Sequence, residues 1–207
     1  MLRRSLPVAF VLITALFVPR PVPAQPPAEI RLRLTRDTVL SGVTCGPTGR
    51  SYAVLFADGA LNECPIARDS VIAGHALPRE TWILLDRSRT LVSAWLARDT
   101  ELQAIPCKGK GYKTWHTRFH RDGQLAGCFL SRDATLDGVP CRAAAFLTEL
   151  SGSTQVALHP GGRLQSCRVA RAVTRDGVTI ARGERITLSA TGAVVRGAVA
   201  RGSAAPR

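Results

Sequence analysis

The chain has 207 residues, and its 28 lysine and arginine residues against 15 aspartate and glutamate residues give a formal net charge of +13 at pH 7. Six residues are cysteines, an even number that suits a disulfide framework in an exported protein. Beyond the N-terminal leader, no segment is apolar over the roughly 20 residues of a membrane-spanning helix. The composition therefore excludes a helical membrane protein and leaves one exported domain or a short repeat array.

Residues 1–24 have the pattern of a secretory signal peptide. A charged start is followed by the apolar run Leu6–Val18, which is too short to span a bilayer, and small residues precede a cut ahead of Gln25. No cysteine stands at the cleavage point, so we expect a periplasmic or secreted protein that is not a lipoprotein. We expect 25–33 to be an N-terminal linker.

The rest of the sequence repeats itself, and the repeats predict an array in which neighbouring units bury each other's apolar faces. Each unit opens with an aliphatic residue, a small residue and arginine, as in LTRD, IARD, LARD, LSRD and VARA, and eight residues after its start stands glycine, or alanine at Ala104. The five units are 34–65, 66–95, 96–129, 130–168 and 169–197. We expect 198–207 to be a disordered tail.

The second half of each unit predicts a β-hairpin. An apolar residue is followed six positions later by another, and turn residues stand between them, as at Asp58-Gly59 and Asp122-Gly123. Asp-Gly between apolar flanks is a strong hairpin signal. Each unit is therefore expected to be a hairpin preceded by a short extended segment, and only 143–150 could form a short helix.

The expected fold is all-β, a tandem array of five β-hairpin repeats of about 30–39 residues that forms an open or solenoid-like sheet braced by disulfides. The alternative is a small closed propeller, although about 30 residues is short for a four-stranded blade.

The cysteines occupy two aligned positions that are filled together or not at all. Units one, three and four hold both; in unit two Leu77 and Ala94 stand there, and in unit five Ile180 and Gly197. A large apolar residue opposite a small one can replace a buried cystine in a packed core. The alignment thus predicts the pairs Cys45–Cys64, Cys107–Cys128 and Cys141–Cys167. This pairing rests on the repeat, and other connectivities stay open.

The loop CKGKGYKTWHTRFHR, residues 107–121, is the strongest candidate for ligand contact. It holds all three lysines of the chain and no acidic residue, and basic side chains interleaved with aromatic ones suit a sugar or an exposed base. The candidate contact residues are Lys108, Lys110, Tyr112, Lys113, Trp115 and Arg118. The simpler interpretation, which we favour, is a solvated loop whose Trp115 packs back onto the hairpin.

Four units carry an Arg-Asp pair near their start. A row of arginines could bind anions. We favour arginines that pair with the aspartates of a neighbouring unit, because equivalent positions of adjacent repeats lie next to each other. The pairs are Arg36-Asp37, Arg68-Asp69, Arg98-Asp99 and Arg132-Asp133.

Histidine positions predict no metal site. His116 and His120 fall on a predicted strand, where four residues span roughly 13 Å. One zinc ion with bonds of roughly 2 Å cannot hold both. His75 and His159 are isolated, and we predict neither a metal nor a cofactor.

Enzyme motifs such as G-x-S-x-G and H-E-x-x-H are missing, and no acid pair recurs on one face, so we predict a protein without catalytic residues. The hairpin motif, as in 56–61 (FADGAL), resembles that of MORN-type repeats, in particular the bacterial variants described as antitoxin-like repeat proteins. The resemblance implies scaffolding or partner binding and no catalytic residues.

We therefore predict an exported, non-enzymatic β-repeat scaffold or protein-interaction protein of the cell envelope. The alternative is a binder of an anionic polymer or envelope glycan through the basic-aromatic loop 108–121, because a basic surface attracts polyanions. A third interpretation is an exported hydrolase without a recognisable motif. The expected partner is an unidentified protein or envelope component, and nucleic acid is not expected.

Overall fold

The computed structural model describes residues 29–48, 52–110, 115–145 and 155–195. The predicted signal peptide, the predicted tail at 198–207 and most of the candidate helix at 143–150 lie outside these ranges. All the regular secondary structure within these ranges is β-strand, so the all-β prediction is confirmed for the part of the chain that is described.

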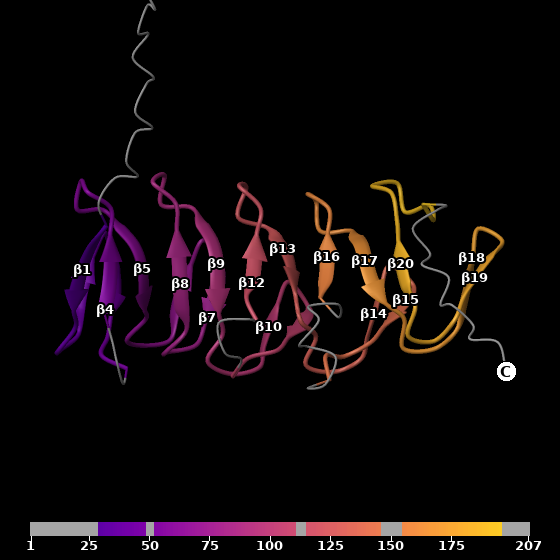
Figure 1. The fold of residues 1–207 in the computed structure, drawn as a ribbon, viewed down its shortest axis with the longest axis horizontal. Coiled ribbons are helices and arrows are strands. Elements are labelled where there is room, and N and C mark those ends of the chain that lie inside the picture. The colour runs from indigo at the N-terminus through magenta and orange to yellow at the C-terminus, as the bar shows by residue number, and fades with distance from the viewer. Residues whose placement is uncertain (1–28, 49–51, 111–114, 146–154, 196–207) are drawn as a thin grey trace, which may run out of the picture.

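Ten strands form one antiparallel sheet, in the order β1-β4-β5-β8-β9-β12-β13-β16-β17-β20. Their bounds are β1 (Ile30–Arg33), β4 (Tyr52–Leu55), β5 (Leu61–Pro65), β8 (Trp82–Leu85), β9 (Leu91–Trp95), β12 (Thr117–Phe119), β13 (Leu125–Cys128), β16 (Val156–Leu158), β17 (Leu164–Arg168) and β20 (Arg185–Thr187). Figure 1 shows these strands side by side in chain order, with β1 and β20 as the end strands of an open sheet.

Four of the five hairpins predicted from turn residues are confirmed within this sheet, and in the fifth unit the described residues show one isolated bridge, Leu188↔Val194, beyond β20. In the first, between β4 and β5, the Phe56 and Ala60 backbones hydrogen-bond across the turn, and the register shifts by one residue between Val54 and Leu55. Only Gly59 of the Asp-Gly pair has a positive φ, 83°. The turn therefore resembles the longer hairpin loop that ends in a bulge rather than the tight two-residue loop.

Short two-stranded hairpins precede the sheet hairpins. They are β2 (Thr38–Leu40) with β3 (Val43–Cys45), β6 (Ser70–Ile72) with β7 (His75–Leu77), β10 (Thr100–Leu102) with β11 (Ile105–Cys107), β14 (Ala134–Leu136) with β15 (Val139–Cys141), and β18 (Val173–Arg175) with β19 (Val178–Ile180). The prediction of a single extended segment here is wrong, because the aligned glycine is the second residue of a tight turn. Both central residues have positive φ, as at Asp137 (47°) and Gly138 (78°), and Ala104 takes the glycine's place at 62°.

The hydrophobic core lies between the ten-stranded sheet and the short hairpins. The sheet contributes fully buried leucines at the start of each returning strand, and the short hairpins contribute Leu77, Val139 and Ile180, all 1% exposed or less. Alternate strand residues point to opposite faces, so the remaining sheet residues lie on the opposite face, which we call the outer face.

The three disulfides are Cys45–Cys64, Cys107–Cys128 and Cys141–Cys167, and the predicted pairing is confirmed. Each joins the second strand of a short hairpin to the returning strand of the next sheet hairpin. All six cysteines are at most 1% exposed. In unit two, Leu77 and Ala94 are buried at the corresponding positions, as the packing argument predicted.

Residues 30–33 differ from the expected linker over 25–33. They form β1, which pairs with β4 from Ile30↔Leu55 to Arg33↔Tyr52. The segment alternates apolar and arginine residues, a strand pattern, but all four residues are exposed. Backbone pairing rather than burial holds this end strand.

Candidate functional site

The predicted contact loop begins as a closely packed segment. The Lys108 amide donates to the Phe129 carbonyl at 2.7 Å, and the Lys110 amide donates to the Leu96 carbonyl at 2.9 Å. Between them, a Cβ on Gly109 would lie 2.0 Å from the carbonyl carbon of Arg98, so only glycine fits this approach. The loop is thus fastened to the ends of β9 and β13. Tyr112 and Lys113 lie outside the described residues.

Trp115 packs within the protein, as the simpler interpretation expected. The Lys108 ammonium lies 4.7 Å from the centre of the Trp115 ring, within the range of a cation–π contact. Lys108 Nζ also donates to the Ala144 carbonyl at 3.2 Å, and the rings of Trp115 and Phe129 lie 6.5 Å apart. Of the predicted contact residues, Lys108 and Trp115 therefore contact each other.

Arg118 is placed differently, because it lies on the outer face of the sheet. It is exposed in the middle of β12, between the buried residues Thr117 and Phe119. Its register partners are Ser93 on β9 and Gly127 on β13, and Gly127 in turn lies opposite Ala157 on β16. The arginine therefore stands in a row of small residues.

A groove of about 500 Å³ on the outer face includes two members of this row, Ser93 and Arg118. It is lined by Leu84, Val92, Ser93, His116, Arg118, Phe119, His120, Ala126, Leu158 and Gln165. These residues belong to strands from β8 to β17 or adjoin them, and most of the lining surface is apolar. Of the predicted contact residues that the structure describes, Arg118 lines the outer-face groove, which also reaches His116 beside Trp115.

The charged side chains of the ten-stranded sheet are mainly arginines. Its strands contain five arginines, one glutamate and no lysine or aspartate, and alternation places all six on the outer face. They are Arg31, Arg33, Glu63, Arg118, Arg168 and Arg185. Arg168 and Arg185 are direct register partners on β17 and β20. Burial lowers the pKa of Arg185, and the neighbouring Arg168 charge adds to this effect.

Aromatic side chains gather on the same face near its N-terminal end. The rings of Tyr52 and Trp82 lie 5.4 Å apart in an edge-to-face arrangement, and Trp82 is the register partner of Trp95 on β9. Arg31 lies over the Tyr52 ring, 5.2 Å from its centre. All three rings are partly exposed. The outer face thus combines aromatic rings with arginines, and the sequence did not predict this because the residues are spread over separate repeats.

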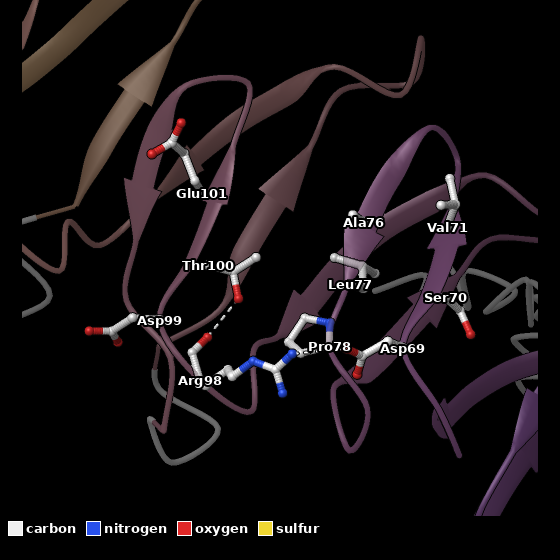
Figure 2. A pocket seen from close by; sticks show the side chains of 10 residues that line it. All are labelled: Asp69, Ser70, Val71, Ala76, Leu77, Pro78, Arg98, Asp99, Thr100 and Glu101. Atoms are coloured by element: carbon white, nitrogen blue, oxygen red, sulfur yellow. Dashed lines mark hydrogen bonds and ion pairs between the residues drawn. The ribbon is translucent and has the colours of Figure 1, made fainter.

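A second groove, of about 470 Å³, lies between the short hairpins β6–β7 and β10–β11 (Figure 2). Its lining includes the acidic residues Asp69, Asp99 and Glu101, and Arg98, whose guanidinium pairs with Asp69. Carboxylates that share a groove are the first place to look for acid–base catalysis. Their environment decides whether one of them can act as an acid.

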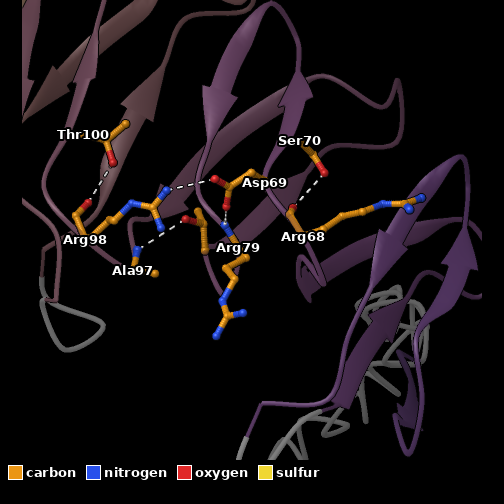
Figure 3. A network of polar contacts seen from close by, with 8 residues as sticks. Arg68, Asp69, Ser70, Arg79, Ala97, Arg98 and Thr100 are labelled. Atoms are coloured by element: carbon orange, nitrogen blue, oxygen red, sulfur yellow. Dashed lines mark hydrogen bonds and ion pairs between the residues drawn. The ribbon is translucent and has the colours of Figure 1, made fainter.

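Asp69 is held as an anion in this groove (Figure 3). Its Oδ1 accepts the Arg79 amide at 2.7 Å, and its Oδ2 pairs with the Arg98 guanidinium at 2.9 Å. The Arg79 amide first, and then Arg98, lower the pKa of the Asp69 carboxyl. A general acid at neutral pH requires the opposite shift. Asp69 therefore serves the structure here.

In the Arg-Asp motif, the aspartate carboxylate repeatedly accepts a backbone hydrogen bond that holds the short hairpin in place. The Asp99 and Asp133 carboxylates accept the amides of Gly109 and Ala143, ten residues on, as Asp69 accepts that of Arg79. The arginines vary: Arg98 pairs with Asp69 of the preceding unit, which confirms the predicted ladder at one step. Arg132 instead approaches Glu101 at 3.5 Å, and Arg68 donates to the Thr44 hydroxyl.

The serine or threonine that follows the Arg-Asp pair adds a second side-chain to backbone hydrogen bond at the same place. Thr38, Ser70 and Thr100 each donate to the carbonyl of the arginine two residues earlier, at 3.0, 2.9 and 2.8 Å. This turn is a common side-chain to backbone bond of serine and threonine. The repeated R-D-S/T spacing carried that signal, and the sequence reasoning missed it.

Three histidines each lie within hydrogen-bonding distance of a backbone carbonyl in the following unit. His75 Nε2 lies 2.7 Å from the Gly123 carbonyl, His120 Nε2 3.0 Å from that of Leu158, and His159 Nε2 2.9 Å from that of Leu188. His120 and His159 each directly follow the first apolar residue of the predicted hairpin, Phe119 or Leu158, a signal that the sequence reasoning also missed. Across the described ranges, no three His, Cys, Asp or Glu side chains are grouped so that they could hold a metal ion.

Comparisons with models of protein families, with curated proteins and with solved structures found no match to this chain. Within the described part of the chain, no helix is long and apolar enough to cross a membrane. The three disulfides indicate an oxidising environment. The class that the structure defines is thus a disulfide-containing, all-β protein built on one open antiparallel sheet.

Proposed function

We propose that this protein is an exported, non-enzymatic β-repeat scaffold that binds a partner of the cell envelope through the outer face of its sheet. The observation that carries the proposal is the composition of that face: a shallow groove, partly exposed aromatic rings and five arginines against one glutamate. Aromatic and arginine residues are enriched where proteins bind partners.

The same proposal includes a five-unit array of the MORN-like kind, exported by the signal peptide at 1–24. Recurrent contacts support the repeat: the disulfides join equivalent positions, and the aspartates of the Arg-Asp motif accept equivalent amides. The open order of the sheet favours the array over the closed propeller. An array buries apolar surface through neighbour contacts alone and leaves a long face for binding.

Photo-crosslinking in the native envelope tests the proposal with matched positions. A photoreactive residue replaces Val92, which is 39% exposed and lines the groove, or Val71, which is 73% exposed on a short hairpin. We expect a discrete crosslinked adduct from position 92 and none from position 71. Adducts from position 71 alone, or from neither position, would overturn the outer face as the binding surface. Turnover of the captured partner would favour the exported hydrolase.

The second candidate is a binder of anionic polymer or envelope glycan through the loop 108–121. It is supported by the Lys108 ammonium over the Trp115 ring, a pairing of cation and aromatic surface that also suits sugars. Retention on immobilised heparin tests it. Loss of retention in Lys108→Ala/Lys110→Ala, with retention kept in Arg118→Gln, would favour the loop over the groove.

A further inference from the structure

We propose that the outer-face groove binds a linear polysaccharide that carries carboxylate groups, and that Arg118 pairs with one of these carboxylates. The inference rests on the proposed function, since it assumes that the outer face is a binding surface, and it names the class of ligand and the residue that selects it.

The shape of the groove suits a chain rather than a compact molecule. Its lining extends from β8 to β17, six consecutive strands in the sheet order. Neighbouring strands lie about 4.8 Å apart, so the groove is on the order of 24 Å long. It is open to solvent, whereas sites for compact ligands enclose most of the ligand surface.

The direction of the groove favours a polysaccharide over an extended peptide. A peptide that binds to a sheet adds to an edge strand, where unpaired backbone groups supply hydrogen bonds. The strands beneath this groove lie inside the sheet and are paired on both sides, as β12 is with β9 and β13. The groove crosses these strands and offers a ligand side chains only.

The floor suits the flat face of a sugar ring. Ser93 and Ala126 are small, and their neighbours Gly127 and Ala157 leave the middle of the face low. Leu84 and Val92 add apolar surface at one end. Hydrocarbon faces of sugar rings can rest on such a floor and remove apolar area from water.

Polar groups stand along the floor at intervals. The Ser93 hydroxyl donates to the Thr117 carbonyl at 3.0 Å, so its oxygen can still accept a hydrogen bond. Gln165 is exposed at the far end, and its side-chain amide can both donate and accept. Sugar hydroxyls need this mixture of donors and acceptors.

Arg118 selects an acidic chain over a neutral one. Among the strand residues of this face the single carboxylate is Glu63 on β5, three strands away or on the order of 14 Å, which exceeds the screening length of about 8 Å at physiological ionic strength. Among the described residues, Arg118 forms no ion pair. A guanidinium forms paired, charge-assisted hydrogen bonds with a carboxylate, which a neutral glycan lacks.

Titration calorimetry of the full exported chain with oligogalacturonate, a uronic acid oligomer, tests the inference. Neutral cello-oligosaccharide and dextran sulfate, a sulfated glucan without carboxylates, are the comparison ligands. We expect oligogalacturonate to bind, the affinity to fall as salt is added, and the neutral oligomer to bind much more weakly. Equal affinity for the neutral oligomer, or binding of dextran sulfate alone, would overturn the assignment of a carboxylate ligand.

Two variants locate the site, and a third controls for net charge. Arg118→Gln is expected to weaken oligogalacturonate binding roughly tenfold or more, the scale of one charge-assisted hydrogen bond. Ala126→Phe should weaken it by filling the groove without changing charge. Arg36→Gln removes the same charge from an exposed position ahead of the first short hairpin and should leave affinity unchanged.

The outcomes separate this inference from the function on which it rests. Equal affinity of Arg118→Gln and the unchanged protein would overturn the site, given identical circular dichroism and disulfide maps. If position 92 crosslinks to an envelope partner but no polysaccharide binds, the scaffold function stands and the carbohydrate inference fails. If neither occurs, both fail.

Discussion

The carboxylate of Asp137 accepts a hydrogen bond from the backbone amide of Leu164 at 2.8 Å, and so joins the tip of the short hairpin β14–β15 to the start of β17. The same bond recurs along the chain: Ser41 accepts from Leu61, Gln103 from Leu125, and Asp176 from Val194. In unit two the position is Ala73, which has no side-chain acceptor. These tip bonds align the two layers of the core.

Asp137→Ala tests the contribution of a tip bond. Leu164 is buried, so its amide would lose its partner away from water, at a cost of about 1–3 kcal/mol in the free energy of unfolding. Thr135→Ala, at an exposed position of the same hairpin, is the control and should change little. Urea unfolding followed by circular dichroism measures both. Equal stability of the two variants would show that the tip bond contributes nothing.

Ala73→Asp tests the same relationship by adding the missing acceptor. Ala73 has φ 50°, a conformation that Asp adopts more readily than Ala. An aspartate there can accept from the returning strand as Asp137 does, and we expect a gain of about 0.5–1.5 kcal/mol in the free energy of unfolding. A loss of stability in the same urea titration would contradict the proposed equivalence of the tips.

Gly109→Ala is expected to be costly because of backbone contact rather than φ. A Cβ there would lie 2.2 Å from the Arg98 carbonyl oxygen, so the loop must shift, at about 1–3 kcal/mol. Gly177→Ala is the matched control, since its Cβ meets nothing within 4 Å and alanine already stands at the equivalent Ala104. It should cost no more than about 1 kcal/mol. Thermal unfolding of both variants measures which one loses more stability. A larger loss of stability in Gly177→Ala than in Gly109→Ala would contradict the prediction.

Removal of a disulfide should lower stability by roughly 3 kcal/mol in the chain-entropy model, because 26 residues separate the longest pair, Cys141 and Cys167. The double variant Cys141→Ala/Cys167→Ala avoids a free thiol. A non-reducing peptide map of this variant should retain Cys45–Cys64 and Cys107–Cys128. A shuffled bridge in that map, or unchanged stability in urea, would contradict the role assigned to the bridge.

The Asp69 carboxyl should titrate below its ordinary pKa of 3.8, because the Arg79 amide and then the Arg98 guanidinium favour its charged form. A pKa that is lower in the folded state adds stability above the unfolded pKa, and this stability is lost as the pH falls through the folded pKa. Asp69→Asn should therefore be less stable than the unchanged protein at neutral pH and equal to it in strong acid. Carbon-detected NMR titration checks the midpoint; a value at or above 3.8 would refute the assignment.

The repeat alignment predicted the all-β class, the sheet hairpins and the three disulfide pairs. Asp-Gly turns and alternating apolar residues specify hairpins through residues that are only a few positions apart in the sequence. The cysteines could be paired because they align at equivalent positions of the units. The short hairpins were missed, although the glycine that signals them was seen. Strands of three residues, such as Thr38–Leu40, are too short to show an alternating pattern.

The placement of the candidate site depended on how the strands pair. Arg118 was chosen as part of a basic loop, yet it lies on the outer face in a row with Ser93, Gly127 and Ala157, while Lys108 turns onto Trp115. Residues from four strands meet in that row because cross-strand register joins positions that are far apart in sequence. Local pattern therefore predicted the sheet hairpins and the disulfides, and the pairing of strands in space created the groove.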